Sequence, residues 1–263
     1  MRSGKHYFDG PLPRLIAHRG FAGPGADGSA AAVENTLPAF AAALSLGATH
    51  LETDVHASSD GIAMISHDPG LSRLVGREGT VSDFTADELR SIDLGGGVGF
   101  CSLSDALVAF PNARFNIDIK SADAVDPTIE AITANAATKR VLVTSFSGAR
   151  RSRAVRALPG VATSASAVGF VVALLASKLG LVPVMRLALR GVDAVQVPEK
   201  ALHLKVTTRR MIGHLHSIGV EMHVWTIDDR DDMIRLLDLG VDGIITDRAD
   251  LAQSVWTSRL PAR

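Results

Sequence analysis

The sequence predicts an α/β fold, a single (β/α)₈ TIM barrel in which helices cover a closed ring of parallel strands. Three observations support it. Short β-like runs alternate with amphipathic helical stretches, and no Gly-rich dinucleotide fingerprint favours an open doubly wound sheet. Polar residues also follow the carboxyl ends of several runs, where barrels carry their chemistry. The length of 263 residues suits one such barrel, which we expect to span residues 1–263.

The expected strands are short runs rich in apolar and β-branched residues. They cover residues 14–20, 49–57, 61–68, 114–120, 140–146, 161–166, 193–198, 221–227 and 242–247. Amphipathic helical stretches at 37–47, 208–219 and 230–240 each end in Gly directly before a strand. Because Gly commonly terminates helices, these three stretches are predicted to be covering helices of the barrel.

One apolar region could be mistaken for a membrane span. Residues 157–177 are uncharged and contain AVGFVVALLA, but this apolar part is shorter than the roughly 20 residues that cross a bilayer. We expect a buried strand followed by a buried helix here. Residues 1–15 lack the apolar core of a signal peptide, so a cytoplasmic location is expected.

Composition excludes several other classes of function. The formal net charge of -1 provides no electrostatic footprint for nucleic acid. Cys101 is the only cysteine, which rules out an intrachain disulfide and a cysteine-based zinc site. The oligomeric state is not determined by these features.

The second and third expected strands are separated by only three residues. Parallel strands need a connection of about a dozen residues, so the stretch at about residues 50–67 must form an antiparallel hairpin. A tight two-residue turn would place Glu52 opposite His67 and Asp54 opposite Ile65. Since alternate side chains share a face, Glu52, Asp54 and His67 are expected to point the same way.

Two strands contribute the candidate metal ligands. Glu52 and Asp54 on one face repel each other unless a cation or protons neutralise them. Oxygen ligands of this kind suit Mg²⁺ or Ca²⁺, with Mn²⁺ as a further candidate. In RFNIDIK (114–120), alternation places Asp118 and Lys120 on one side, so a third carboxylate and an ammonium can join the site.

The other candidate residues suit chemistry on a phosphate group. Arg19 and Lys120 supply positive charge for phosphate oxygens. His18 and His67 can exchange protons near neutral pH, one accepting from the nucleophile and the other donating to the leaving oxygen. Together with the carboxylates, these residues predict a metal-assisted reaction on a phosphate.

Three residues near the site have alternative interpretations. Glu34 either complements the start of the helix capped by Thr36 or orients the side chains at positions 18 and 19. Trp225 either belongs to the core or packs on the part of the substrate that is not phosphate. His56 alternates onto the opposite face of its strand and is interpreted as structural.

Six motifs in sequence order resemble those of the glycerophosphodiester phosphodiesterase family. They are AHRG (17–20), ENTLPAF (34–40), LETDVHASSDGIAMISHD (51–68), NIDIK (116–120), VWTID (224–228) and LGVDGIITDRADL (239–251). The resemblance implies a TIM barrel that hydrolyses glycerophosphodiesters to glycerol 3-phosphate and an alcohol with one divalent metal. It also implies a small insertion at about residues 68–101 that shapes the substrate cleft.

The resemblance assigns roles to individual positions. His18 and His67 match the acid/base pair of the family, and Arg19 matches its phosphate-contacting arginine. Glu52 and Asp54 match metal ligands of the family, and Asp118 occupies the position of a further carboxylate. Lys120 matches the basic residue that follows. Family members usually carry Glu at the position of Asp118, so this carboxylate reaches one methylene less far.

Two other functions remain open. In the first, the same fold acts on lysolipids as a phospholipase D, with apolar segments 168–175 and 182–185 flanking an acyl-binding mouth. Peripheral contact of the protein with a membrane is compatible with this alternative. In the second, a non-catalytic barrel binds phosphorylated ligands, and the shortened Asp118 is the only feature that favours it. Comparing the hydrolysis of glycerophosphocholine with that of its acylated form distinguishes the phospholipase D activity from glycerophosphodiester hydrolysis. A turnover assay with added metals distinguishes a non-catalytic barrel from an enzyme.

Overall fold

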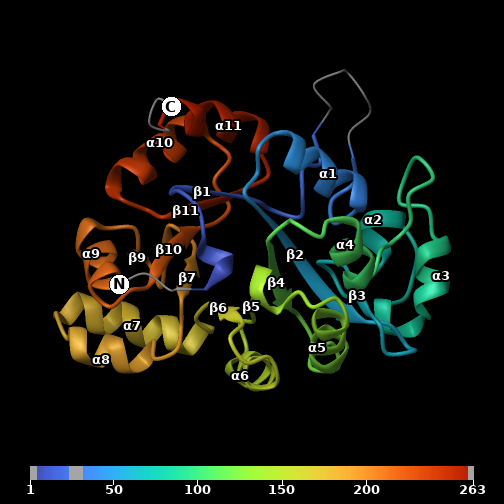
Figure 1. The fold of residues 1–263 in the computed structure, drawn as a ribbon, viewed down its shortest axis with the longest axis horizontal. Helices are drawn as coiled ribbons and strands as arrows, with labels where there is room; N and C mark the ends of the chain where they lie inside the picture. Colours follow the sequence, from blue (N-terminus) through green and yellow to red (C-terminus); the bar gives the residue numbers. More distant parts are fainter. Residues whose placement is uncertain (1–4, 24–31, 260–263) are drawn as a thin grey trace.

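The computed structural model describes residues 5–23 and 32–259, so the two ends of the expected 1–263 domain and residues 24–31 lie outside the described part. Its parallel strands are β1 (Arg14–Ala17), β2 (His50–Ala57), β4 (Phe115–Ile119), β5 (Val141–Thr144), β6 (Ala162–Thr163), β7 (Ala194–Val197), β10 (Glu221–Val224) and β11 (Gly243–Thr246). They pair in the order β6-β5-β4-β2-β1-β11-β10-β7. A parallel bridge between Ser164 and Ala194 joins the two ends of this order, which makes the predicted barrel a nearly closed ring (Figure 1).

Helices alternate with these strands around the outside. They are α1 (Leu37–Ser45), α4 (Leu103–Ala109), α5 (Val125–Ala134), α6 (Gly148–Ala157), α7 (Ala167–Leu179), α8 (Val182–Ala188), α9 (Arg209–Ser217), α10 (Arg230–Leu239) and α11 (Ala249–Thr257). The three helices expected from the sequence are present as α1, α9 and α10. Thr36 caps α1 as expected, since its hydroxyl accepts a hydrogen bond from the backbone N–H of Ala39. Gly240, with φ 98°, ends α10 in the left-handed conformation.

The expected antiparallel hairpin is formed by β2 and β3 (Ala63–Ile65). Its register places Val55 opposite Ile65. The loop contains three residues rather than two, because Gly61 adopts a left-handed φ of 78° and the N–H of Ser58 bonds the carbonyl of Ile62 at 3.0 Å. A third loop residue in this conformation is a common way to close a hairpin, and it shifts the pairing by one position.

The predicted pairings of Glu52 with His67 and of Asp54 with Ile65 are therefore wrong. β3 ends at Ile65, and the N–H of Ser66 donates to the carbonyl of Asp54 at 3.0 Å before the chain leaves the strand. His67 consequently reaches the site from the irregular segment after β3, and strand alternation does not orient it.

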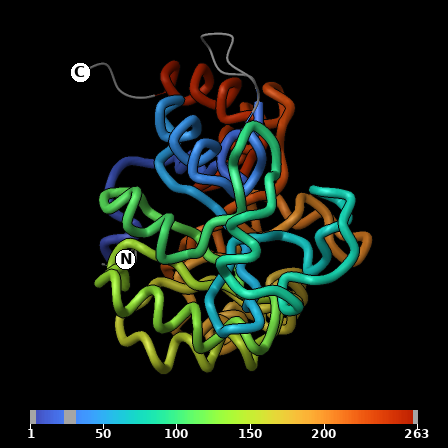
Figure 2. The backbone as a smooth tube through the Cα atoms, turned by 90° about the vertical axis from the view of Figure 1, so that its right-hand side faces the viewer, coloured from blue at the N-terminus to red at the C-terminus, as the bar shows by residue number. Residues whose placement is uncertain are grey.

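The segment between β3 and α4 forms a small side structure. It contains α2 (Ser72–Val75), η2 (Val81–Asp83) and α3 (Ala86–Ser91) at the position of the expected insertion, and it faces the viewer in Figure 2. Leu71, Leu89 and Phe100 pack with Met64 of β3 in an apolar cluster separate from the main core. The insertion is thus anchored directly behind the hairpin that leads to His67.

The opposite end of the ring is covered by η1 (His6–Phe8). Tyr7 and Phe8 are buried against residues at the starts of β5, β6 and β7. The first residue of β1, Arg14, pairs with Glu221 at the start of β10, with Nε 2.7 Å from Oε2. Because this end is filled by side chains, the open end of the barrel lies at the carboxyl ends of the strands.

The uncharged region at residues 157–177 folds into β6 and the first part of α7. The strand is buried as expected, but the helix is buried on one face only. Val168 and Leu175 expose 74% and 47% of their surface, so the expectation of a buried helix holds for one face of α7 and is wrong for the other. Among the described residues, no helix is long and apolar enough to span a bilayer.

Candidate active site

A cavity of about 480 Å³ opens at the carboxyl ends of the barrel strands. Of the residues singled out from the sequence, those that line it are His18, Arg19, Glu52, Asp54, His67, Asp118, Lys120 and Trp225. Glu34 lies behind this lining and accepts a hydrogen bond from Arg19 Nη1 at 3.1 Å. The fold thus gathers residues that are up to 207 positions apart in the sequence into one pocket.

A tight turn after β1 positions His18 and Arg19. Arg19 and Gly20 both have positive φ, 55° and 83°, so the chain reverses directly after the strand. Only glycine fits at the second position, since a Cβ on Gly20 would lie 2.7 Å from the carbonyl carbon of Ala39. The turn aims the backbone N–H of Arg19 at Glu52 Oε2, 3.1 Å away.

Three carboxylates gather on two neighbouring strands. Glu52 and Asp54 share a face of β2, and the β2–β4 register places Asp118 beside Asp54. All three are buried. Burial and the adjacent Asp54 carboxylate raise the pKa of Glu52 to about 8, and burial also raises the pKa of Asp118. Glu52 therefore binds a proton at neutral pH more readily than an exposed carboxylate does.

Cationic side chains partly compensate these carboxylates. Lys120 Nζ lies 2.8 Å from Asp54 Oδ1 and 2.8 Å from Asp118 Oδ2. Burial disfavours the charged ammonium, but the two carboxylates outweigh this effect and raise the pKa of Lys120. Arg19 Nε lies 3.5 Å from Asp54 Oδ2. Both cations border the cavity, where they can also reach an anionic ligand.

Each of the two candidate histidines is held by an aspartate. His18 Nδ1 lies 2.8 Å from Asp247 Oδ1, and His67 Nδ1 lies 2.7 Å from Asp68 Oδ1. A carboxylate only accepts hydrogen bonds, so it keeps the hydrogen on Nδ1 and leaves Nε2 for a ligand. Burial lowers the pKa of His18, yet the bond to Asp247 and the nearby Glu52 outweigh it and the pKa is raised.

Several residues of this arrangement escaped the sequence reasoning. Asp68 directly follows His67, and Asp247 ends the last strand run, so both occupied recognisable positions but received no role. Arg73 gave no signal, because it lies in the insertion. Its guanidinium binds both Asp68 and Glu34, which links the supports of His67 and Arg19.

The oxygen atoms around the carboxylate cluster fit a hard divalent cation. Asp118 Oδ1 and Asn116 Oδ1 are buried without a hydrogen-bond partner among the described residues. Within residues 5–23 and 32–259, no His, Cys, Asp or Glu residues form a ready-made cage of three or more ligands, and Lys120 occupies the space between Asp54 and Asp118. Binding a cation would thus require Lys120 to withdraw from between the two carboxylates.

Another part of the cavity is lined by apolar side chains. Phe146, Phe170, Val171 and Leu202 contribute to it, beside polar side chains such as Gln196 and Thr226. The ring of Trp225 meets Phe146 edge to face with centroids 6.4 Å apart, so Trp225 belongs to this wall. A ligand that fills the cavity would meet charged groups at one end and apolar side chains at the other.

The sequence model of the glycerophosphoryl diester phosphodiesterase family matches residues 18–251. The chain is 40% identical to a Mycobacterium tuberculosis protein named "Probable glycerophosphodiester phosphodiesterase 2", over 93% of this chain and 90% of that one. It is 30% identical to a glycerophosphodiester phosphodiesterase of Caldanaerobacter subterraneus, over 89% and 93% of the two chains.

Solved structures have the same fold. A glycerophosphodiester phosphodiesterase from Thermotoga maritima superposes with a TM-score of 0.68 at 26% identity, covering 92% of this chain and 98% of that one. A phosphodiesterase from Oleispira antarctica, in complex with the product sn-glycerol-3-phosphate, superposes with a TM-score of 0.71 at 21% identity. This match covers 94% of this chain and 96% of that one. By its sequence match from His18 to Leu251, this chain belongs to the glycerophosphoryl diester phosphodiesterase family.

Proposed function

We propose that the protein hydrolyses glycerophosphodiesters to glycerol 3-phosphate and an alcohol. The observation that carries the proposal is the pair of aspartate-held histidines at the edge of a pocket that also contains Arg19, Lys120 and buried carboxylates. The names of the relatives support the same activity. The glycerol phosphate half of the substrate would occupy the charged end of the cavity.

In this proposal, the cations stabilise the phosphate as its charge grows in the transition state. The Arg19 guanidinium can donate two hydrogen bonds to phosphate oxygens, and the Lys120 ammonium adds a point charge. The Arg19 guanidinium pairs with Glu34, and the Lys120 ammonium lies between Asp54 and Asp118. Preorganised charge of this kind is usually the largest contribution to such a reaction.

The histidines move the protons. One imidazole Nε2 takes the proton from the attacking hydroxyl, of water or of the substrate's own glycerol. In the second case the attack forms a cyclic glycerol phosphate, which water then opens to glycerol 3-phosphate. The other histidine donates a proton to the alkoxide oxygen as its bond to phosphorus breaks. Asp68 and Asp247 stabilise the imidazolium that forms in either position.

We propose Glu52, Asp54 and Asp118 as ligands of one divalent cation, Mg²⁺ or Ca²⁺, with Mn²⁺ as an alternative. When bound, such an ion acts as a Lewis acid on the phosphate oxygens. The support for it is the raised pKa of Glu52 and the unpaired Asp118 Oδ1. Once Lys120 withdraws from Asp54 and Asp118, its ammonium is available to the phosphate.

The deciding experiment measures turnover of glycerophosphocholine and of its acylated form by wild type, His18→Ala and His67→Ala. Each variant should lose about 10²- to 10⁴-fold in kcat/KM and keep its fold, while His6→Ala at an exposed position keeps wild-type turnover. A chelator should abolish activity, and Mg²⁺, Ca²⁺ or Mn²⁺ should restore it. Wild-type rates in either site variant would contradict the histidine assignment. Cleavage of the acylated diester alone would indicate a lysophospholipase D.

A further inference from the structure

The charges of the chain are distributed very unevenly. Residues 131–192 contain nine of the 27 Lys and Arg residues, whereas all 28 Asp and Glu residues lie outside this segment. The segment runs from the last turn of α5 through η3 (Thr138–Arg140), β5, α6, β6, α7 and α8 to the loop before β7. A protein with an overall net charge of -1 therefore contains a long segment whose charged side chains are all basic.

The same segment exposes apolar side chains on two helices that pack against each other. In α7 the exposed residues follow helical spacing and form one stripe, which consists of Val168, Val172, Leu175 and Leu179. In α8 and the turn before it they are Leu181, Val184 and Leu187. Figure 1 shows the two helices side by side at the lower left edge of the molecule. We call this surface the α7–α8 face.

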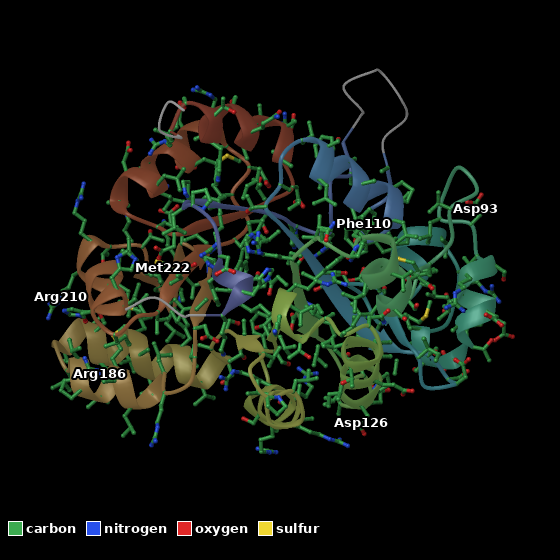
Figure 3. The ribbon with its side chains drawn as sticks, viewed as in Figure 1. Asp93, Phe110, Asp126, Arg186, Arg210 and Met222 are labelled. Carbon is green, nitrogen blue, oxygen red and sulfur yellow. The ribbon has the colours of Figure 1, made fainter. Side chains whose placement is uncertain are left out.

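Cations flank the α7–α8 face without acidic partners. Lys178, Arg186 and Arg190 are exposed, and none of the three has an ion-pair partner within residues 5–23 and 32–259. Arg186 and Arg210 lie along the same edge of the molecule in Figure 3, while Asp93 and Asp126 lie away from it. Three cations without an acidic partner among the described residues thus lie on the same two helices as the apolar stripes, or directly after them.

The α7–α8 face continues into the rim of the cavity. Phe146 and Leu202 line the cavity and still expose 60% and 59% of their surface. The N–H of Ala167, the first residue of α7, donates to the carbonyl of Phe146 at 3.2 Å. Val171, one turn further along α7, also lines the cavity. A surface that covered the α7–α8 face would adjoin the mouth of the pocket.

We infer that the α7–α8 face docks on an anionic lipid bilayer. Apolar side chains that enter the acyl boundary while nearby cations contact anionic headgroups are the features of an interfacial membrane-binding helix. A second copy of the chain fits this face less well, because two copies packed face to face would oppose the same unpaired cations. The inference concerns binding to a surface and does not rest on the proposed hydrolysis.

Vesicle co-sedimentation tests the inference. The full-length protein should sediment with vesicles of phosphatidylcholine mixed with phosphatidylglycerol and much less with phosphatidylcholine alone, and added salt should release it. The double variant Leu179→Gln/Leu187→Gln should partition at least about tenfold less, because two exposed leucines no longer enter the bilayer. The double variant Lys178→Gln/Arg186→Gln should lose about fivefold per cation on the anionic vesicles alone.

A matched control separates docking from general surface hydrophobicity. Val108 of α4 is 66% exposed and lies outside the α7–α8 face, so Val108→Gln should sediment as wild type does. Melting followed by circular dichroism should give the same midpoint for all variants. The inference is overturned if wild type stays in solution with both vesicles, or if Leu179→Gln/Leu187→Gln binds as wild type does. A wild-type dimer in light scattering that this variant dissociates would instead identify a second copy as the occupant.

Discussion

The carboxylate of Asp247 holds Nδ1 of His18 at 2.8 Å from its Oδ1, and a separate aspartate holds His67 in the same way. Asp247 is in turn positioned by its backbone N–H, which donates to Asp228 Oδ1 at 2.8 Å. The two histidines thus have matching supports, one from the segment after β3 and the other from the end of β11. If they exchange protons with a substrate, these supports should affect the rate of reaction more than the affinity.

Asp247→Asn tests the support of His18. The amide no longer stabilises an imidazolium and can turn its NH₂ toward Nδ1, which favours the wrong tautomer. We expect kcat to fall about tenfold to a hundredfold, less than the loss of a histidine itself, with KM nearly unchanged. Steady-state kinetics would measure the split. Asp250→Asn, which breaks only a surface pair with Arg248, serves as the control. An unchanged kcat in Asp247→Asn would argue against a catalytic His18.

Removal and return of a divalent cation should change stability as well as activity. Because burial and Asp54 raise the pKa of Glu52 to about 8, a bound cation would displace a proton, and its affinity should increase with pH through this value. At a concentration of about 100 Kd, a ligand adds about 2.7 kcal/mol to the free energy of unfolding. Thermal melts at pH 6 and about pH 8, with and without Mg²⁺, Ca²⁺ or Mn²⁺, would measure this effect.

Asp118→Asn should weaken that stabilisation, whereas Asp118→Glu, the residue usual in the family, should retain it. Asp126→Asn is the matched control, because its carboxylate is 64% exposed and pairs only with Arg153. Equal melting shifts for wild type and Asp118→Asn would exclude Asp118 as a ligand.

The barrel was predictable because its signals are local. Strand and helix runs, terminating glycines and the capping Thr36 are each recognisable within a few residues of sequence. The register of the hairpin was not predictable, because it depends on whether Gly61 belongs to the loop or to the strand. A shift of one residue moves His67 to another position. The support of the site by Arg73 was also hidden, because its contacts with Asp68 and Glu34 exist only once the insertion is folded.

Gly20 should be irreplaceable in the turn that carries His18 and Arg19. Its φ is 83°, and an added Cβ would lie 2.7 Å from the backbone of Ala39. We expect Gly20→Ala to lower the free energy of unfolding by about 2 kcal/mol or more and to displace the Arg19 guanidinium. Urea denaturation would measure the loss.

Gly213 in α9 provides the opposite case. A Cβ there would meet nothing within 4 Å, so Gly213→Ala should raise stability by about 0.5–1 kcal/mol through its helix propensity. Equal effects of the two substitutions would show that the turn after β1 tolerates a side chain.

His50 at the start of β2 should make the fold sensitive to acid. Its ring is fully buried, with Nε2 3.0 Å from the carbonyl of Tyr7 and Nδ1 2.8 Å from Thr49 Oγ1. A carbonyl only accepts, so Nε2 carries the hydrogen. Burial lowers the pKa of His50 from 6.5 to about 3. Between these values the unfolded chain binds a proton at this residue that the folded protein does not.

Stability from His50 is therefore complete above about pH 6.5 and is lost as pH falls toward 3, by up to about 1.4 kcal/mol per pH unit. Urea denaturation at pH 7 and at about pH 5 should show a smaller decrease for His50→Gln than for wild type, by about 2 kcal/mol, although the variant is less stable at pH 7. His203→Gln, at an exposed histidine, should keep the wild-type decrease. Parallel pH dependences for wild type and His50→Gln would mean that the buried ring takes up its proton in the folded state, and that burial does not hold it neutral.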